Sequence, residues 1–258
     1  MFYKTIDFST FSSIQIGQAI PILMIEKEDK IPKNKQIIGH SNNILISPNP
    51  PELMMLSKDF SFIKLNENIL TIGCATSTGQ IFSFVKKNNI KGFEFLFQLP
   101  GSLGGLIAMN AGVKEYEIFN ILDSIKINNQ WIKKEFIKYG NRFAILNAVV
   151  TEARFQVTQG FEQHQVEEIL QFRSNQPKKP TLGSTFLNPK GEHAGQLIEA
   201  VGLKGYQYGA IQWSNIHANF LVNHGNGTFK EAMTLIALAK EKVYKRFKIH
   251  LKEEIKIL

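Results

Sequence analysis

The sequence has a single cysteine, Cys74, so no disulfide can form within the chain. This usage is typical of a reducing compartment and excludes a small disulfide-stabilised scaffold. The sequence also lacks an uninterrupted apolar run of the ~18 residues that a membrane-spanning helix needs. Its apolar stretch at residues 14–25 is broken by Gln15, Gln18 and Pro21, and no small-residue cleavage site follows it. We therefore expect a cytoplasmic protein without a signal peptide or membrane span.

Two common phosphate-binding signatures are missing as well. No Gly-x-Gly-x-x-Gly opens a helix after a strand, and no Gly-x4-Gly-Lys-Ser/Thr occurs. The 6 histidines and the one cysteine show no metal-ligand spacing, so no metal is predicted. The net charge of +8 favours an anionic partner, but no run of five basic residues marks a nucleic-acid arm. A diphosphate-containing small molecule therefore fits the charge better than nucleic acid does.

Apolar patterning predicts an α+β fold in two domains, and 258 residues are enough to bury a core in each. Apolar runs bounded by turn residues predict strands at 36–39, 44–46, 60–65, 69–73, 124–128, 130–137 and 145–157. Helical spacing predicts helices at 78–87, 163–173 and 194–201, with Val166, Ile169 and Leu170 on one face of the second. A further short helix is expected from Ser102, its cap, through Ala111, with Gly112 as its stop.

The last part of the chain carries the clearest helix start. Thr228 and Glu231 form a capping box that opens a long helix, and a strand at 251–258 is expected to follow it. The predicted core face of that helix is Phe229, Ala232, Ile236, Val243 and Phe247. The turn residues Thr158-Gln159-Gly160 predict the boundary between a domain at 1–157, with lobes of about 1–60 and 61–157, and a domain at 158–258.

Two loops rich in glycine and asparagine lie in the first predicted domain. Residues 100–105 read Pro-Gly-Ser-Leu-Gly-Gly, and Met109-Asn110-Ala111-Gly112 follows them. A second loop between predicted strands holds Gly39 and Asn43. Glycines let backbone N–H groups approach a ligand, and a following helix N-terminus attracts negative charge. One such segment is as often a tight turn, but two in one β-rich domain suit a ligand with two phosphates.

A third motif, Gly183-Ser184-Thr185-Phe186, lies in the second predicted domain and has Arg173 upstream. The glycine sets a serine at a turn, where its hydroxyl can donate a proton near an anion-binding guanidinium. Taken alone, such a serine more often bonds its own backbone.

In their order along the chain, these motifs resemble the UDP-N-acetylenolpyruvoylglucosamine reductase family, and the similarity covers nearly the whole sequence. Further matching segments are 98–99, 188–189, 194–199, 202–205, 217–220, Asn223 and 251–255. The resemblance implies an FAD-binding domain of two β-rich lobes, of the vanillyl-alcohol-oxidase-like fold, and a C-terminal α+β substrate domain. It also implies that NADPH reduces FAD, which then reduces UDP-N-acetylglucosamine enolpyruvate to UDP-N-acetylmuramate for peptidoglycan synthesis. The expected state is a monomer that binds no nucleic acid.

The resemblance places FAD on the two glycine loops of the first domain. The implied cofactor residues are Gly39, His40, Ser41, Asn42, Asn43, Pro100, Gly101, Ser102, Gly104, Gly105, Asn110, Ala111 and Gly112. The first loop departs from the family pattern, because His40, Ser41 and Asn42 stand where glycine, glycine and serine are usual.

The resemblance also assigns catalytic roles. Ser184 matches the serine that protonates the substrate enolate, and Glu254 matches a carboxyl that stabilises this intermediate. Such a carboxyl should be protonated, so burial should raise its pKa. The neighbouring Glu253 should point the other way, because successive strand residues face opposite sides.

One family residue is replaced. Glycine occupies position 140, where an arginine that binds the substrate carboxylate is usual, and Arg142 is the expected substitute. Lys138 is the other basic residue nearby. Further substrate contacts are expected from Arg173, Lys178, Asn188 and Asn223, although a solvated loop explains Lys178 equally well.

Two alternatives stay open on the sequence. One is another FAD-dependent oxidoreductase with the same cofactor fold, against which Ser184 and Glu254 argue. The other is a basic protein that binds nucleic acid or an envelope surface, which explains the charge but leaves both glycine loops without a role.

Overall fold

The structure, a computed structural model, describes residues 1–258 and combines helices and strands in an α+β fold. The chain forms two compact units that interleave in sequence. The first unit comprises residues 1–4, 22–40 and 52–174, and the second comprises 5–21, 41–51 and 175–258. The chain thus leaves the first unit for the last time at 174/175, seventeen residues beyond the boundary expected at 157/158 (174 − 157 = 17).

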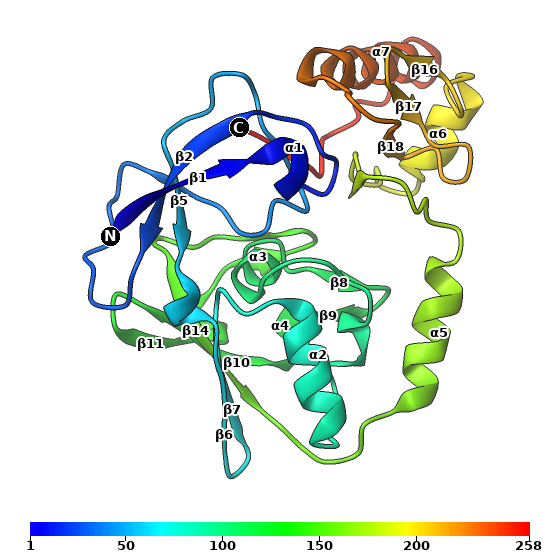
Figure 1. The fold of residues 1–258 in the computed structure, drawn as a ribbon. Helices are drawn as coiled ribbons and strands as arrows, with labels where there is room; N and C mark the ends of the chain where they lie inside the picture. Colours follow the sequence, from blue (N-terminus) through cyan, green and yellow to red (C-terminus); the bar gives the residue numbers. More distant parts are fainter. The chain divides into compact units, whose positions relative to one another are not determined.

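The first unit contains a five-stranded antiparallel sheet in the order β11-β10-β14-β7-β6 (Figure 1). Its strands are β6 (Ile63–Asn66), β7 (Ile69–Gly73), β10 (Leu122–Ile127), β11 (Gln130–Lys133) and β14 (Val150–Gln156). One row of aligned apolar residues crosses all five strands, formed by Ile63, Ile72, Ala153, Ile125 and Ile132. Because side chains alternate along a strand, this row and the rows two residues away make one face of the sheet apolar.

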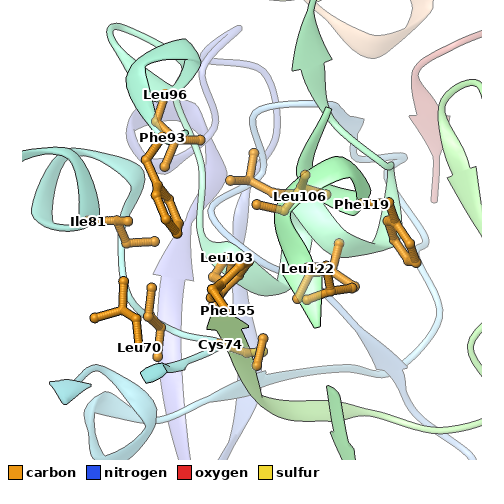
Figure 2. Close-up of a cluster of buried hydrophobic side chains, with 14 of the residues drawn as sticks. Leu70, Cys74, Ile81, Phe93, Leu96, Leu103, Leu106, Phe119, Leu122 and Phe155 are labelled. Atoms are coloured by element: carbon orange, nitrogen blue, oxygen red, sulfur yellow. The ribbon is translucent and has the colours of Figure 1, made fainter. Parts of the chain in front are cut away.

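Short helices cover that apolar face (Figure 2). They are α2 (Thr78–Lys87), α3 (Leu103–Ala108) and α4 (Ile118–Ile121). Leu103 of α3 and Phe119 of α4 are fully buried in the same cluster as Leu70 and Phe155 of the sheet. The loop 100–112 is therefore anchored at its centre by core packing.

Further elements lie wholly in the first unit or, for two strands, partly in the second. The sheet β1-β2-β5-β3 contains β1 (Phe2–Asp7), β2 (Ala19–Ile25), β5 (Leu53–Leu56) and β3 (Gln36–Ile37), and its pairs β2–β5 and β3–β5 are parallel. Two hairpins are β8 (Gly112–Val113) with β9 (Tyr116–Glu117) and β12 (Tyr139–Gly140) with β13 (Phe143–Ala144). The remaining helix is α5 (Gln163–Arg173), and 3-10 turns lie at Lys58–Phe60, Glu94–Leu96 and Lys134–Phe136.

The second unit contains a four-stranded sheet in the order β15-β18-β17-β16. These strands are β15 (Thr181–Ser184), β16 (Gln207–Tyr208), β17 (Ile211–Trp213) and β18 (Phe220–Asn223). They share a core with α6 (Ala194–Ala200) and α7 (Phe229–Phe247). The short helix α1 (Phe8–Phe11) and the parallel pair β4 (Ile44–Leu45) with β19 (Lys256–Ile257) complete this unit. The pairing of β4 with β19 explains why residues 41–51 group with the end of the chain.

Elements with strong local signals agree with their predicted bounds. β7, α2 and α5 begin and end at the expected residues, and the Thr228–Glu231 capping box at the start of α7 is confirmed. Ala232, Ile236 and Val243 of α7 are buried as expected, whereas Phe229 and Phe247 are only partly buried.

Other expectations were wrong. The helix expected through Ala111 ends at Ala108, because Asn110 adopts a positive φ of 40°, and the Ser102 side chain makes no capping hydrogen bond. The strands expected at 145–157 and 251–258 are limited to 150–156 and 256–257. Leu170 of α5 is 44% exposed and not part of the core. No helix of the chain combines the length and apolar character needed to cross a membrane.

The close approach at Gly112 gives a prediction about stability. A Cβ at Gly112 would lie 2.0 Å from the carbonyl oxygen of Tyr116, across the β8–β9 pair, whereas a Cβ at the helical Gly79 would meet no atom within 4 Å. We expect Gly112→Ala to lower the free energy of unfolding by about 1–3 kcal/mol. The control Gly79→Ala should raise it by up to about 1 kcal/mol, since alanine has the higher helix propensity. Denaturant unfolding measures both values, and equal stability of the two variants would contradict the prediction.

Candidate functional site

The loop 100–105 packs tightly against the end of β7. The amide of Leu103 donates to the carbonyl of Thr76 and that of Gly104 to the carbonyl of Cys74, both at 2.9 Å. A Cβ at Gly104 would lie 3.2 Å from the Cys74 oxygen, so glycine permits this approach. The first amides of α3 are therefore bonded to the protein's own backbone. Burial raises the pKa of the Cys74 thiol, so this side chain is a neutral part of the packing.

Gly39 and His40 meet this loop within the first unit. A Cβ at Gly39 would lie 2.7 Å from the Ser102 hydroxyl oxygen and 3.9 Å from the Gly105 nitrogen. The His40 ring is partly buried and hydrogen-bonds the backbone of Gly101. Burial lowers the pKa of His40, and the bond to Gly101 opposes this only in part. The start of the first predicted FAD loop thus meets the second loop here.

Asn110 lies at the turn after α3, and its side chain is completely buried. Its Nδ2 donates to Glu117 Oε2 at 2.7 Å and to the carbonyl of Gly140 at 3.1 Å. Its Oδ1 accepts from the amide of Phe119 at 3.3 Å. The amide of Ile118 donates to the carbonyl of Ala111 at 3.0 Å. The loop 110–112 is therefore connected to the segment that holds Gly140.

Arg142 follows in the tight turn of the β12–β13 hairpin, where its φ is 61°. Its Nη2 donates to the carbonyl of Gly112 at 3.3 Å. Tyr139 of the same hairpin stacks on Phe119, with ring centroids 4.1 Å apart. The structure thus brings Arg142 beside the predicted cofactor loop. Arg173, at the end of α5, is partly buried, and burial lowers its guanidinium pKa.

Residues 41–43 belong to the second unit. Ser41 adopts a φ of 53°, and its buried Oγ has no hydrogen-bond partner. The buried Oδ1 of Asn42 has none either. Asn43 connects this loop to the end of the chain, because its Nδ2 donates to the carbonyl of Glu254 at 3.1 Å and its carbonyl accepts from Lys256 at 2.9 Å. Two buried polar side-chain atoms without partners in one loop suit a polar ligand.

The segment after Ser184 is bonded on two sides. Gly183 adopts a φ of 82°, where the regular pairing of β15 with β18 is interrupted. The Thr185 amide donates to the carbonyl of Asn219 at 2.8 Å, and the Thr185 carbonyl accepts from the amide of Glu254 at 2.8 Å. Ser184 and Glu254 therefore lie close together in the second unit although 70 positions separate them (254 − 184 = 70).

The two neighbouring acids near the end of the chain differ in their partners. Glu253 is bridged to Phe186 through the backbone, and its Oε1 accepts from Lys240 Nζ at 2.7 Å. The strand expected to contain both residues begins only at Lys256, and Glu254 lies in a bend.

Asn223, a predicted substrate residue, has four hydrogen bonds to backbone groups. Asn223 is 2% exposed, and its Nδ2 donates to the carbonyls of Ile14 and Gln15 at 2.9 and 3.2 Å. Its Oδ1 accepts from the amides of Gly225 and Gly227 at 2.9 and 3.1 Å. The side chain of Asn223 is therefore fully engaged with loop backbone.

Asn188 and Lys178 are exposed in the second unit. Asn188 Oδ1 accepts from the amide of Ala194 at the start of α6, at 3.0 Å. Beside Lys178, the Lys179 Nζ lies 2.7 Å from His224 Nδ1. His224 Nε2 in turn lies 2.9 Å from Gln212 Oε1.

Asn219 is a buried residue beside the Ser184 segment to which the sequence analysis gave no role. It is 3% exposed; its Oδ1 accepts from the amide of Phe186 at 3.0 Å, and its Nδ2 donates to the Phe186 carbonyl at 2.8 Å. The Asn219 side chain thus makes the two hydrogen bonds to Phe186 that a neighbouring strand would otherwise make. The matched segment 217–220 contained it, but nothing in the local pattern indicated which backbone it would bond.

Three comparisons with known proteins agree. A family model described as UDP-N-acetylenolpyruvoylglucosamine reductase, C-terminal domain, matches residues 176–258. The UDP-N-acetylenolpyruvoylglucosamine reductase of Helicobacter pylori (strain ATCC 700392 / 26695) is 45% identical over 258 residues, which cover all of both chains. That of Helicobacter hepaticus is 44% identical and covers 98% of each chain. The crystal structure of UDP-N-acetylenolpyruvylglucosamine reductase from Thermus caldophilus has a TM-score of 0.86 at 23% identity, covering 100% of this chain and 99% of that one, which supports the fold.

The lowered pKa of His40 predicts a pH dependence of stability. The folded state holds the His40 proton less tightly than the unfolded state does. Unfolding therefore takes up a proton as the pH falls below the unfolded pKa, and the stability is lost progressively down to the folded pKa. We expect the unfolding free energy of His40→Gln to fall less steeply from about pH 7 to about pH 5 than that of the wild type. His217, whose pKa burial also lowers, serves as the comparison in His217→Gln. Parallel wild-type and His40→Gln curves in denaturant titrations would exclude the contribution of His40.

Proposed function

The chain belongs to the UDP-N-acetylenolpyruvoylglucosamine reductase family, and from this premise we propose that it reduces UDP-N-acetylglucosamine enolpyruvate to UDP-N-acetylmuramate with Ser184 as the proton donor. The reaction uses NADPH and FAD and serves peptidoglycan synthesis. The observation that carries the role of Ser184 is the backbone bonding of Thr185 to both Asn219 and Glu254. It fixes the residue next to Ser184 from two sides.

The reaction requires one hydride and one proton. When bound, FAD would provide the hydride for the enolpyruvyl double bond, with NADPH as the source of electrons. The carbon next to the carboxylate then carries an enolate, which needs a proton. A serine hydroxyl is a weak acid, but an enolate is a strong base, so an oriented serine suffices. Gly183 lets the chain adopt the left-handed conformation that sets the direction of Ser184.

Glu254 is proposed to support the enolate through a protonated carboxyl group. The pairing of Glu253 with Lys240 favours this choice between the two acids, because the Glu253 side chain already has a basic partner. A neutral carboxylic acid can donate a hydrogen bond to an oxyanion, whereas a carboxylate would repel it.

FAD is proposed to bind through the loops at 39–43 and 100–112 and through the β-rich lobes that carry them. The residues present suit a diphosphate. Because Gly39 has no side chain, its backbone can lie close to the Ser102 hydroxyl. The buried hydroxyl of Ser41 can donate a hydrogen bond to a phosphate oxygen. The side-chain amide of Asn42 can also donate a hydrogen bond to a phosphate oxygen when its NH₂ group faces the ligand. His40 is held by Gly101 and shapes the loop.

Arg142 is proposed to bind the substrate carboxylate in place of the arginine that the family usually has at position 140. A guanidinium matches a carboxylate with two parallel hydrogen bonds, and it stabilises the negative charge that grows in the transition state. Arg173, Lys178 and Asn188 are proposed to contact the UDP part of the substrate. Asn223 is proposed to support substrate binding indirectly, because its Oδ1 holds the backbone amides of Gly225 and Gly227. We also propose that the enzyme is a cytoplasmic monomer.

Replacing Ser184 separates the two half-reactions. Ser184→Ala should bind FAD and accept electrons from NADPH at the wild-type rate, because the hydroxyl has no part in that step. Reoxidation by the enolpyruvyl substrate should slow by about 10²-fold or more. Stopped-flow absorbance of the flavin measures both steps, and flavin reduction is the internal control. Reoxidation of Ser184→Ala at the wild-type rate would show that the proton comes from another group.

Comparing two basic residues tests the carboxylate site. Arg142→Ala should slow reoxidation by about 10-fold or more while FAD binding changes little, and Arg142→Lys should recover only part of the rate. Lys138→Ala is the matched control and should behave like the wild type. A normal Arg142→Ala with an impaired Lys138→Ala would assign the role to Lys138. If both variants were normal, Arg173→Ala would be the next test.

A further inference from the structure

We propose that Asn110 is a positioning residue that holds the backbone at Gly140 and thereby fixes Arg142 for the substrate carboxylate. The inference depends on the proposed role of Arg142 and adds a residue that acts through it. Asn110, which the resemblance implies as a cofactor residue, is proposed to act on Gly140 and not to contact cofactor or substrate.

The hydrogen bonds of Asn110 exclude a direct role. A side-chain amide has two N–H donors, and those of Asn110 are used by Glu117 at 2.7 Å and by the Gly140 carbonyl at 3.1 Å. Its oxygen accepts from Phe119. With an exposed fraction of 0%, the residue offers no surface to a ligand. Its backbone φ of 40° is one that asparagine tolerates better than most residues.

The bond to Gly140 acts on the turn that carries Arg142. Gly140 and Phe143 are paired residues of the β12–β13 hairpin, and Arg142 lies between them in the left-handed region. A second bond, from Arg142 to the Gly112 carbonyl, ends on the same loop as Asn110. Two hydrogen bonds thus attach the turn to residues 110–112. One is made by the backbone carbonyl of Gly140 and the other by the guanidinium of Arg142.

Position 140 also explains why the guanidinium comes from residue 142. A Cβ at Gly140 would lie 2.7 Å from the Phe143 ring. A long side chain there would have to displace Phe143 and the hairpin with it. With glycine at 140, the carbonyl of this residue can meet Asn110 while Arg142 supplies the charge.

Glu117 makes it possible to test the bond to Gly140 separately from the rest. In Glu117→Gln, the new amide oxygen can still accept from Asn110, so this variant is the reference. In Asn110→Asp/Glu117→Gln, the new carboxylate at position 110 accepts from the new side-chain amide at position 117 and from the Phe119 amide. This carboxylate has no proton to give Gly140, whose carbonyl then faces a carboxylate oxygen. Only the hold on Gly140 is lost by design.

The first measurement is stopped-flow kinetics of both half-reactions. Reoxidation by the enolpyruvyl substrate should be about 10-fold to 10²-fold slower in Asn110→Asp/Glu117→Gln than in Glu117→Gln, because misplacing a binding group by about 1 Å costs this much. Flavin reduction by NADPH should be equal in the two. When Arg142→Ala is added to both proteins, the difference in reoxidation should disappear, since the two residues act in series. The inference would be overturned if Asn110→Asp/Glu117→Gln and Glu117→Gln were reoxidised at equal rates. It would also be overturned if their rates still differed after Arg142→Ala is added to both.

The second measurement does not depend on activity. Hydrogen–deuterium exchange should become faster in a peptide covering residues 138–145 of Asn110→Asp/Glu117→Gln, and should stay unchanged in α2. Asn110→Gly repeats the test with a residue that tolerates the positive φ, in case the double variant fails to fold. Unchanged exchange at 138–145 in the variant that folds would overturn the inference. A failure of the proposed function is distinguishable, because it would appear in the wild type as an inability to reduce the substrate.

Discussion

The peptide groups on either side of Thr185 are the constraint on which the proposed catalytic arrangement depends. One donates to Asn219 and the other accepts from Glu254, so three segments distant in sequence are joined at one residue. Side chains support the same junction: Asn219 bonds Phe186 twice, and Phe186 packs on Trp213 in the core. The proposed role of Ser184 needs a fixed direction for its hydroxyl, and backbone bonds and core packing hold the residues that follow it.

Buried asparagines recur wherever the chain leaves regular structure near the site. Asn110, Asn219 and Asn223 are each no more than 3% exposed, and each bonds at least two backbone groups. A loop inside a protein has peptide groups that neither a helix nor a sheet satisfies, and leaving them unpaired is costly. The short amide side chain has both donors and an acceptor, so it can replace a missing strand. These residues therefore satisfy backbone groups in loops that have no neighbouring strand.

The sequence predicts the locally determined parts of this fold and fails where distant segments meet. The bounds of α2, α5 and β7 follow from apolar spacing and end residues, and the Thr228 capping box follows from its two side chains. The roles that the motif resemblance gives Ser184 and Glu254 stay predictions. The grouping of residues 5–21 and 41–51 with the second unit could not be predicted, since the two-residue pair β4–β19 has no periodicity to reveal it. Nor could the partners of Asn110, because they depend on tertiary structure.

The parallel pairing of β4 with β19 has a consequence for how the protein is made. Ile44 pairs with Lys256, so 212 positions of chain separate the partners (256 − 44 = 212). At a synthesis rate of about 5–20 residues per second, residue 44 waits for about 10–40 s before its partner exists. The first unit, whose large sheet is complete at residue 156, can form during this time. Residues 44 and 45 therefore remain without this pairing until the end of the chain has been synthesised.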